Sequence, residues 1–328
     1  MSKLSRSFFA ALTRCYPLMK GGGKLANLLP MRAMSSKPEV VEAKLRGGGR
    51  LLVPINDYVG RPIFWTGDFD RRVSWVLRRV LRPGDAVLDI GANLGVYAVQ
   101  AARLVGPGGV VHAIEPQREV ADLLERSVAL NGLTNTTVHC LGLSDHDGEA
   151  KLGYRQDDTG GRGIVPDDSP RNTLAIEVRE ASGFLSSLEF GSVRARSVSE
   201  CAAGESLADA SCSDKAGRNA GMRLMKLDVE GHEPQVLAAA RPWLAQHPPD
   251  CVLFESHAEG GPFMDRPEVQ TLASLGYRFA ALRAGWLSVS PVPVATSEDA
   301  ARCRAIDYLA VHEETAERDA VLRKMVGS

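Results

Sequence analysis

Apolar positions in the middle of the chain follow two periods, which indicates alternating strands and helices. Residues 86–90 form a short apolar run after the turn Arg82-Pro83-Gly84 and predict a strand. Residues 94–105 repeat apolar side chains every three or four positions, as one helix face does, before the glycine-rich stop at 106–109. A second strand at 110–114, a helix ending near Leu130 and a third strand at 136–143 follow. This order predicts βαβ units and a mainly parallel sheet.

The alternation lapses between residues 151 and 221 and then resumes. Residues 202–221 are mostly Ala, Ser, Gly and Asp, which predicts a flexible surface insertion. Further strands are predicted at 224–228, 250–255, 277–282 and 305–312, with helices at 234–244 and about 268–275. We therefore predict an α/β fold with a doubly wound, Rossmann-like, seven-stranded and mostly parallel sheet. It would span residues 61–328, with the insertion at 151–221 and a basic, partly helical lead-in at 1–60.

Composition narrows the class of protein. The net charge of −1 over 328 residues disfavours a nucleic-acid partner. The longest apolar runs fall short of the roughly 18 residues that a membrane span requires. The six cysteines form no C-x-x-C pair, which favours reduced thiols in a cytoplasmic protein over a zinc site. Cys140 and Cys251 fall in apolar runs and are predicted to lie inside buried strands.

The first 38 residues form a basic, amphipathic segment. They contain seven lysines and arginines and no acid before Glu39, and Leu4, Phe8, Phe9 and Leu12 recur at helical spacing. We favour a helix packed on the catalytic domain, because Gly21-Gly22-Gly23 and a second apolar patch continue the segment. A transit peptide or a helix lying on a membrane surface is the alternative.

The strongest local signal is the segment Asp89-Ile90-Gly91-Ala92-Asn93-Leu94-Gly95 at a strand-to-helix junction. Gly91 and Gly95 let the backbone approach a ligand closely, and the helix N-terminus that follows attracts an anionic group. Glu115 ends the next strand, where an acid can accept hydrogen bonds from two ribose hydroxyls. The full G-x-G-x-x-G is absent because Asn93 stands at its second glycine, which counts against NAD or FAD. A nicotinamide-dependent oxidoreductase is nevertheless kept as the second interpretation.

A second polar group follows the predicted strand at 224–228. Lys226 and Asp228 share one face of that strand, and Asp228 lies at its carboxyl edge, where open α/β sheets bind ligands. Candidate catalytic residues at this edge are Lys226, Asp228, Glu230, His232 and His257. Asp228, His232 and His257 are alternative general bases, and Lys226 would orient Asp228 or stabilise oxyanion charge.

Structural roles compete with these catalytic ones. Glu230 and Glu233 would complement the N-terminus of the next helix, and Lys226–Asp228 would be an ion pair of the fold. His232, Asp228, Glu230 and His257 are donor types that suit Mg²⁺ or Mn²⁺, but their spacing demands no metal and we predict none. Trp65 would be either part of an acceptor pocket or a core residue.

Together these segments resemble the FkbM family of class I S-adenosylmethionine-dependent methyltransferases. The matching segments are residues 87–95, 114–116 and 226–233, preceded by a lead-in at 64–70. The resemblance implies that S-adenosylmethionine is the cofactor. Its methionine end would contact Asp89, Gly91, Asn93 and Gly95, its ribose Glu115 with the adjoining Pro116, and its adenine Ser144 and Asp145.

The resemblance also implies O-methylation of a hydroxyl on a sugar, a glycan or a related secondary metabolite. The sequence departs from the family pattern mainly between 151 and 221, where Ser199-Glu200 and a long Ala/Ser-rich stretch replace a short acidic turn. That segment often shapes the acceptor site in the family. A catalytically inactive S-adenosylmethionine-binding protein is therefore the third interpretation.

Overall fold

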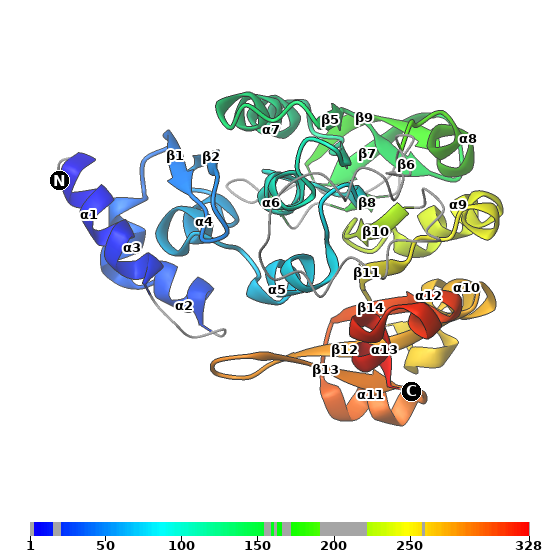
Figure 1. The fold of residues 1–328 in the computed structure, drawn as a ribbon. Helices are drawn as coiled ribbons and strands as arrows, with labels where there is room; N and C mark the ends of the chain where they lie inside the picture. Colours follow the sequence, from blue (N-terminus) through cyan, green and yellow to red (C-terminus); the bar gives the residue numbers. More distant parts are fainter. Residues whose placement is uncertain are drawn as a thin grey trace, which may run out of the picture.

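The central element is an eight-stranded sheet, one strand more than the sequence predicts. The computed structural model describes residues 3–15, 21–153, 159–160, 163–165, 172–190, 222–257 and 260–327. The sheet order is β13-β12-β14-β11-β10-β3-β4-β5 (Figure 1). Its strands are β3 (Ala86–Ile90), β4 (Val110–Ile114), β5 (Thr136–His139), β10 (Met222–Leu227), β11 (Cys251–Glu255), β12 (Tyr277–Ala284), β13 (Val289–Val294) and β14 (Asp307–His312).

The strand order separates this sheet from the dinucleotide-binding fold. Five neighbours, from β5 to β11, run parallel, and β14 is inserted antiparallel between β11 and β12. Numbered along the chain without β13, the strands lie in the order 3-2-1-4-5-7-6, whereas dinucleotide-binding domains use 3-2-1-4-5-6. The unpredicted β13 contains Pro291 and Pro293 and lies at the sheet edge, where proline is tolerated.

Helices cover both faces of the sheet, which confirms the doubly wound α/β prediction. Successive strand residues face opposite cores: Val87 joins one hydrophobic cluster, whereas Leu88 and Ile90 join the other. The first core lies under α5 (Arg71–Val80), α6 (Val96–Val105), α7 (Arg118–Leu130) and α13 (Ala320–Val326). The second lies under α8 (Ala181–Ser186), α9 (Glu233–Gln246), α10 (Pro267–Ser274) and α11 (Ser297–Cys303), with η4 (Phe263–Asp265) and α12 (Glu313–Arg318) in connecting segments.

The single third strand predicted at 136–143 is wrong. The chain leaves the large sheet after β5 and continues as β6 (Gly142–Ser144), which pairs with β9 in a second sheet of order β6-β9-β7-β8. Cys140 lies between the two strands and is only half-buried, whereas Cys251 is buried in β11 as predicted. The apolar run at 136–143 does not indicate that its first half joins the large sheet and its second half the smaller one. The remaining strands are β7 (Gly148–Gly153), β8 (Ile164–Val165) and β9 (Thr173–Glu180).

Regular structure thus extends into the segment predicted as a flexible insertion. Strands β8 and β9 and helix α8 all lie after residue 151. In β9 the buried Ile176 and Val178 alternate with exposed neighbours, as expected of a strand with one covered face. Residues 191–221, including Ser199-Glu200, Cys201 and Cys212, lie outside the described residues.

An N-terminal layer packs beside the first core. Helix α1 contacts α4 through the buried Ala10 and through Thr13, whose hydroxyl donates to the Trp65 carbonyl. Trp65 is fully buried and its indole N–H donates to Ser35 Oγ at 2.9 Å, so it is a core residue. No helix among the described residues is long and apolar enough to cross a membrane. The layer comprises α1 (Lys3–Arg14), α2 (Gly22–Ala26), α3 (Leu29–Met34), β1 (Val40–Lys44), β2 (Arg50–Pro54) and α4 (Gly60–Thr66).

Candidate active site

A buried lysine joins two carboxylates where strands β3 and β10 end. Asp89 and Lys226 are register partners and face the α5–α6 side of the sheet, as Val87 and Leu224 do. Lys226 Nζ lies 3.3 Å from Asp89 Oδ1 and 3.2 Å from Asp228 Oδ2, and it donates to the Gly91 carbonyl at 3.1 Å. The ammonium thus connects the glycine-rich loop to the strand that carries Asp228.

Burial and charge act in opposite directions on this group. Burial alone would lower the pKa of Lys226, but the carboxylates of Asp228 and Asp89 raise it above its ordinary value, so the ammonium stays charged. Burial raises the pKa of Asp89, against the opposing effect of Lys226. The ammonium also lies 5.5 Å from the centre of the Tyr97 ring, whose hydroxyl accepts a hydrogen bond from the Asp70 amide.

Two further acids adjoin Asp228. Glu255 ends β11 and is paired in register with Asp307, which begins the antiparallel β14. Burial, reinforced by nearby carboxylates, raises the pKa of both Glu255 and Asp307 well above the ordinary range, although Arg72 lies 2.6 Å from Asp307 Oδ2. Sequence reasoning missed Asp307 and Arg72. These acids border a small pocket lined by Val73, Lys226, Leu227, Asp228, Leu253, Phe254, Glu255 and Asp307.

The loop after β10 is held by its own backbone. Glu233 is buried, and its carboxylate accepts hydrogen bonds from the Val229 and Gly231 amides at 2.9 Å each. Glu230 is exposed in a left-handed conformation, with φ of 53°. The Asp228 amide donates to the Ile90 carbonyl, and a Cβ added at Gly91 would lie 1.8 Å from the Asp228 carbonyl oxygen. Glycine is therefore required at position 91.

The structure assigns the two candidate histidines to different groups. His257 lies beside the acids, with Nε2 3.4 Å from Glu255 Oε2. His232 instead contacts Ser144, with 3.1 Å between Nε2 and Oγ, and the Ser144 hydroxyl also donates to Asp145. Burial lowers the pKa of His232. Among the residues that the structure describes, no three His, Cys, Asp or Glu side chains are arranged to hold a metal ion.

The glycine-rich loop is tied to Glu115 and to a distant segment. Gly91, Asn93 and Gly95 all have positive φ, and the amides of Gly91 and Ala92 both donate to the Ile114 carbonyl, at 3.0 and 2.9 Å. The Glu115 carboxylate accepts from the amides of Asn93 and Gln117 at 2.9 Å each, next to Pro116. The Asn93 side chain donates to the Thr159 carbonyl at 2.7 Å.

Thr159 connects this loop to the N-terminal layer. Its amide and its hydroxyl both donate to the carboxylate of the buried Asp57, at 2.8 Å each. Asp57 also accepts from the Val59 and Gly60 amides. Sequence reasoning singled out neither Asp57 nor Thr159, because their contact spans about a hundred residues of chain.

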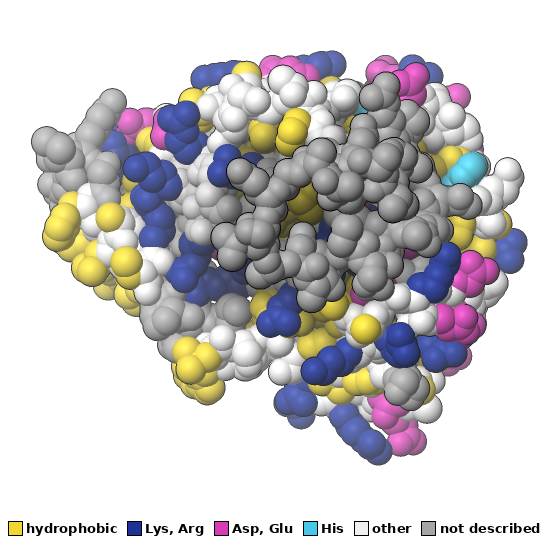
Figure 2. Space-filling view, in the orientation of Figure 1, with side chains coloured by type: hydrophobic (Ala, Val, Ile, Leu, Met, Phe, Trp, Pro, Cys, Tyr) yellow, Lys and Arg dark blue, Asp and Glu magenta, His cyan; other side chains and the backbone are white. Residues whose placement is uncertain are grey.

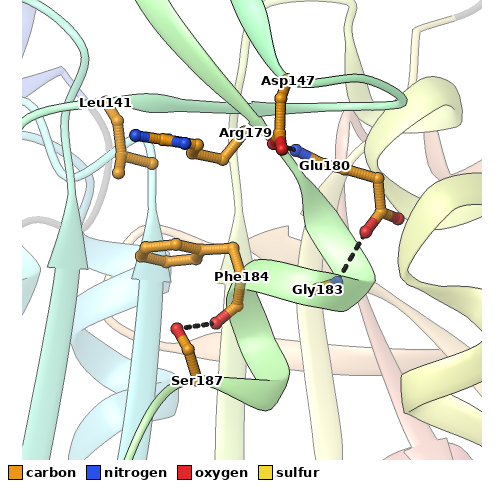
Figure 3. Close-up of a pocket in the computed structure, with 7 residues that line it drawn as sticks. All are labelled: Leu141, Asp147, Arg179, Glu180, Gly183, Phe184 and Ser187. Atoms are coloured by element: carbon orange, nitrogen blue, oxygen red, sulfur yellow. Dashed lines mark hydrogen bonds between the residues drawn. The ribbon is translucent and has the colours of Figure 1, made fainter.

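A larger pocket beside α8 holds no comparable group of reactive side chains (Figure 3). Asp147 accepts from the Glu180 amide at 2.8 Å, and Glu180 in turn accepts from the Gly183 amide as the N-cap of α8. Arg179 pairs with Glu177. These charges therefore stabilise the second sheet and its helix rather than a reaction.

The buried Asp68, in the loop between α4 and α5, is expected to make the stability of the protein depend on pH. Its carboxylate is buried and accepts from the Phe69 amide and the Ser74 hydroxyl, and burial raises its pKa to about 7. The folded state thus binds a proton that the unfolded state, with a pKa of about 4, has lost, so stability falls as pH rises from about 4 to 7. Asp68→Asn keeps the acceptor oxygen without the titration. We expect its Tm to exceed that of the wild type by several degrees at pH 8 and the difference to shrink toward pH 5; parallel Tm-against-pH curves would contradict this.

A family model of known proteins matches the part of the chain that contains these residues. Residues 89–279, more than half of the chain, match the family model for the methyltransferase FkbM domain. The chain belongs to this family. The matched FkbM segment contains Asp89, Glu115, Lys226 and Asp228, the side chains that the structure places around the ends of β3, β4 and β10.

Individual relatives match over shorter stretches. The 31-O-demethyl-FK506 methyltransferase FkbM of Streptomyces tacrolimicus is 34% identical over 94 residues, which is 29% of this chain and 35% of that protein. A protein-L-isoaspartate O-methyltransferase of Methanococcus aeolicus is 31% identical over 121 residues, or 36% and 54% of the two chains. The FkbM-family chain thus spans about a third to a half of the length of these two relatives.

Solved structures show a distant likeness. The crystal structure of the methyltransferase FkbM from Methylobacillus flagellatus KT is 15% identical with a TM-score of 0.36, and the match covers 78% of this chain and 53% of that one. The O-methyltransferase TomG from Streptomyces achromogenes, solved with SAM, is 14% identical with a TM-score of 0.35, covering 74% and 78%. The fold assignment rests instead on the strand order of the large sheet.

Proposed function

We propose that this FkbM-family chain is an S-adenosylmethionine-dependent O-methyltransferase that acts on a hydroxyl of a sugar, a glycan or a related secondary metabolite. The observation that carries the proposal is the position of Lys226. Its ammonium bridges Asp89, beside the glycine-rich loop, and Asp228, beside the acidic pocket. A cofactor site and an acceptor site are thereby held next to each other by one buried cation.

The residues around the glycine-rich loop fit S-adenosylmethionine. Both carboxylate oxygens of the buried Asp89 lack a well-oriented hydrogen bond, although Lys226 is near, so an ammonium donor would satisfy them. Asp89 with Gly91, Asn93 and Gly95 would hold the methionine end. Glu115, beside Pro116, would hold the ribose, and Ser144 with Asp145 would border the adenine, with His232 as a further contact through Ser144.

The acids at this edge of the sheet have different roles in the proposed reaction. When bound, S-adenosylmethionine supplies an electrophilic methyl group on a sulfonium, which becomes a neutral thioether as the acceptor oxygen gains the methyl. Asp228 is the base that removes the hydroxyl proton, and Lys226 orients its carboxylate. Burial and the nearby carboxylates raise the pKa of Glu255 to about 9, so it retains a proton and donates a hydrogen bond to the acceptor, whereas Asp307 is paired with Arg72. His257 and Glu230 border this group.

An exposed aromatic pair lies in the loops that flank α4 and suits an acceptor with C–H faces. The rings of Tyr58 and Phe69 are both exposed, with centroids 6.4 Å apart and edge to face. Tyr58 follows Asp57, which is bonded to Thr159, and Phe69 precedes Asp70, whose amide donates to the Tyr97 hydroxyl. The Streptomyces relative is named for methylation of 31-O-demethyl-FK506, which agrees with an oxygen acceptor.

Calorimetric titration with S-adenosylhomocysteine tests the cofactor assignment. We expect micromolar binding by the wild type and a loss of about 100-fold or more in Glu115→Ala, because two hydrogen bonds to a charged group, about 1.5–3 kcal/mol each, would be lost. Glu119→Ala, an exposed acid in the first turn of α7, is the matched control and should bind as the wild type does.

The same titration separates the competing functions. Binding of NADH without S-adenosylhomocysteine would favour the oxidoreductase interpretation and overturn the proposal. Equal affinity of Glu115→Ala and wild type would remove Glu115 from the ribose site. If S-adenosylhomocysteine binds as expected but a panel of sugar and secondary-metabolite hydroxyls accepts no methyl group, the inactive-binder interpretation would take its place.

A further inference from the structure

Charge is distributed unevenly along the chain. The first 50 residues contain ten lysines and arginines and only two glutamates, whereas the whole chain has a net charge of −1. The N-terminal layer is therefore strongly positive and the remainder of the protein negative. Such an asymmetry indicates an anionic partner for the N-terminal layer, one that the catalytic site does not require.

Helix α1 presents apolar side chains to solvent. Its inner face is already partnered, since Ala10 and Thr13 are buried against α4. Phe8 and Leu12 lie one turn apart on the other side of the helix and are 69% and 61% exposed. In an isolated soluble domain the polar face of a packed helix is expected to face water, so this orientation needs a second partner.

The junction of α2 and α3 repeats this combination. Leu28 and Leu29 are exposed, Leu29 to 83%, and they lie between the exposed basic residues Lys24 and Arg32. In Figure 2 hydrophobic side chains gather at the left of the view over the N-terminal helices, with Lys and Arg side chains next to them. We call Phe8, Leu12, Lys24, Leu28, Leu29 and Arg32 the N-terminal surface.

The turn of the β12–β13 hairpin adds a second exposed apolar group. Trp286 and Leu287 are 71% and 70% exposed and follow the exposed Arg283. In Figure 1 the end of this hairpin extends toward the side of the view occupied by α1, α2 and α3. Tryptophan is the side chain most typical of the interface between lipid and water.

We propose that the N-terminal surface, together with the Trp286-Leu287 turn, binds the surface of an anionic lipid bilayer. The exposed Phe and Leu side chains enter the boundary between headgroups and acyl chains, while Lys24 and Arg32 contact the lipid phosphates. A nucleic acid would match the charge but offers no apolar layer for Leu28 and Leu29. The N-terminal helices lie on the bilayer surface, since no helix in the described part of the chain is long and apolar enough to span it.

Flotation of the full chain with vesicles tests the charge requirement. We expect binding to vesicles of 30% phosphatidylserine in phosphatidylcholine at 0.1 M NaCl, and loss of binding to neutral vesicles or at 0.5 M NaCl. Lys24→Glu with Arg32→Glu should weaken binding by more than about 30-fold, because each substitution removes one attractive charge and adds a repulsive one. Arg302→Glu with Lys324→Glu, on exposed positions of α11 and α13, is the charge-matched control and should bind as the wild type does.

A second set of variants tests the apolar contacts. Leu28→Ser with Leu29→Ser should release the protein from anionic vesicles at an unchanged Tm, because both side chains are exposed. Vesicles should shift the tryptophan emission of the wild type to shorter wavelength, and Trp286→Phe should remove most of the shift, since Trp65 and Trp243 are buried and Trp75 is partly buried.

Three results would overturn the proposal. These are equal binding to neutral and anionic vesicles, tighter binding to RNA than to lipid that the leucine variant retains, and a concentration-dependent dimer that the leucine variant dissolves. Cofactor titration of the same variants keeps the outcome separate from the proposed function, because none of these residues lies in the catalytic site.

Discussion

Asp228→Asn is expected to lower kcat by about 10²–10⁴-fold while leaving the affinity for S-adenosylhomocysteine within a few-fold of the wild type. The amide keeps the size of the side chain and a contact with Lys226, but it cannot take the acceptor proton, and a positioned base supplies a factor of this size. Steady-state kinetics with the acceptor identified by screening, together with calorimetry, measure both quantities.

Glu230→Gln is the comparison for this variant, because it removes a second acid from the same loop. Glu230 is exposed, whereas Asp228 is held beside Lys226, so we expect at most about a tenfold loss of kcat. A large loss of cofactor binding in Asp228→Asn would move Asp228 from the acceptor side into the cofactor site. Equal losses of kcat in the two variants would leave no special role for Asp228.

Lys226→Met is expected to lower the free energy of unfolding by about 3–5 kcal/mol, because it leaves the buried Asp89 carboxylate without its cation. In a protein of this size that corresponds to a fall in Tm of roughly 4–7 °C. The loss should grow with pH, since burial raises the pKa of Asp89 and the carboxyl group escapes the penalty only while it is protonated. Thermal unfolding at pH 6 and pH 8 measures it.

The double variant Lys226→Met with Asp89→Asn separates charge from packing. If the uncompensated carboxylate causes the loss, replacing it by an amide should restore most of the stability without restoring activity. A double variant as unstable as Lys226→Met would instead show that the other contacts of the ammonium, with the Gly91 carbonyl, Asp228 and the Tyr97 ring, carry the effect.

Part of the site could be predicted from the alternation of side chains along the strands. Strand residues alternate in direction, so Lys226 and Asp228 had to share a face, and the short apolar runs at 86–90 and 110–114 located Asp89 and Glu115 at strand ends. The roles assigned to these residues remain proposals, but their positions at one sheet edge were predictable.

The rest of the site depends on tertiary contacts and strand pairings, which a local sequence pattern does not predict. Arg72 and Tyr97 reach the site from two helices whose placement depends on packing. The separation of His232 from His257 depends on a loop held by Glu233. Asp307 was missed because the direction of β14 is decided by its neighbours: only an antiparallel strand brings its first residue to the edge where parallel strands end.

Because β14 is antiparallel, the length of the segment before it determines whether Asp307 reaches the site. Side chains of a strand alternate with a period of two, so moving β14 by one residue along β11 would turn Asp307 to the opposite core and place a neighbour beside Glu255. The segment between α11 and β14 contains none of the proposed site residues, yet its length sets this register. A single-residue deletion there would act as an active-site mutation at a distance, and an alignment that tolerates gaps at that point would misassign the acid.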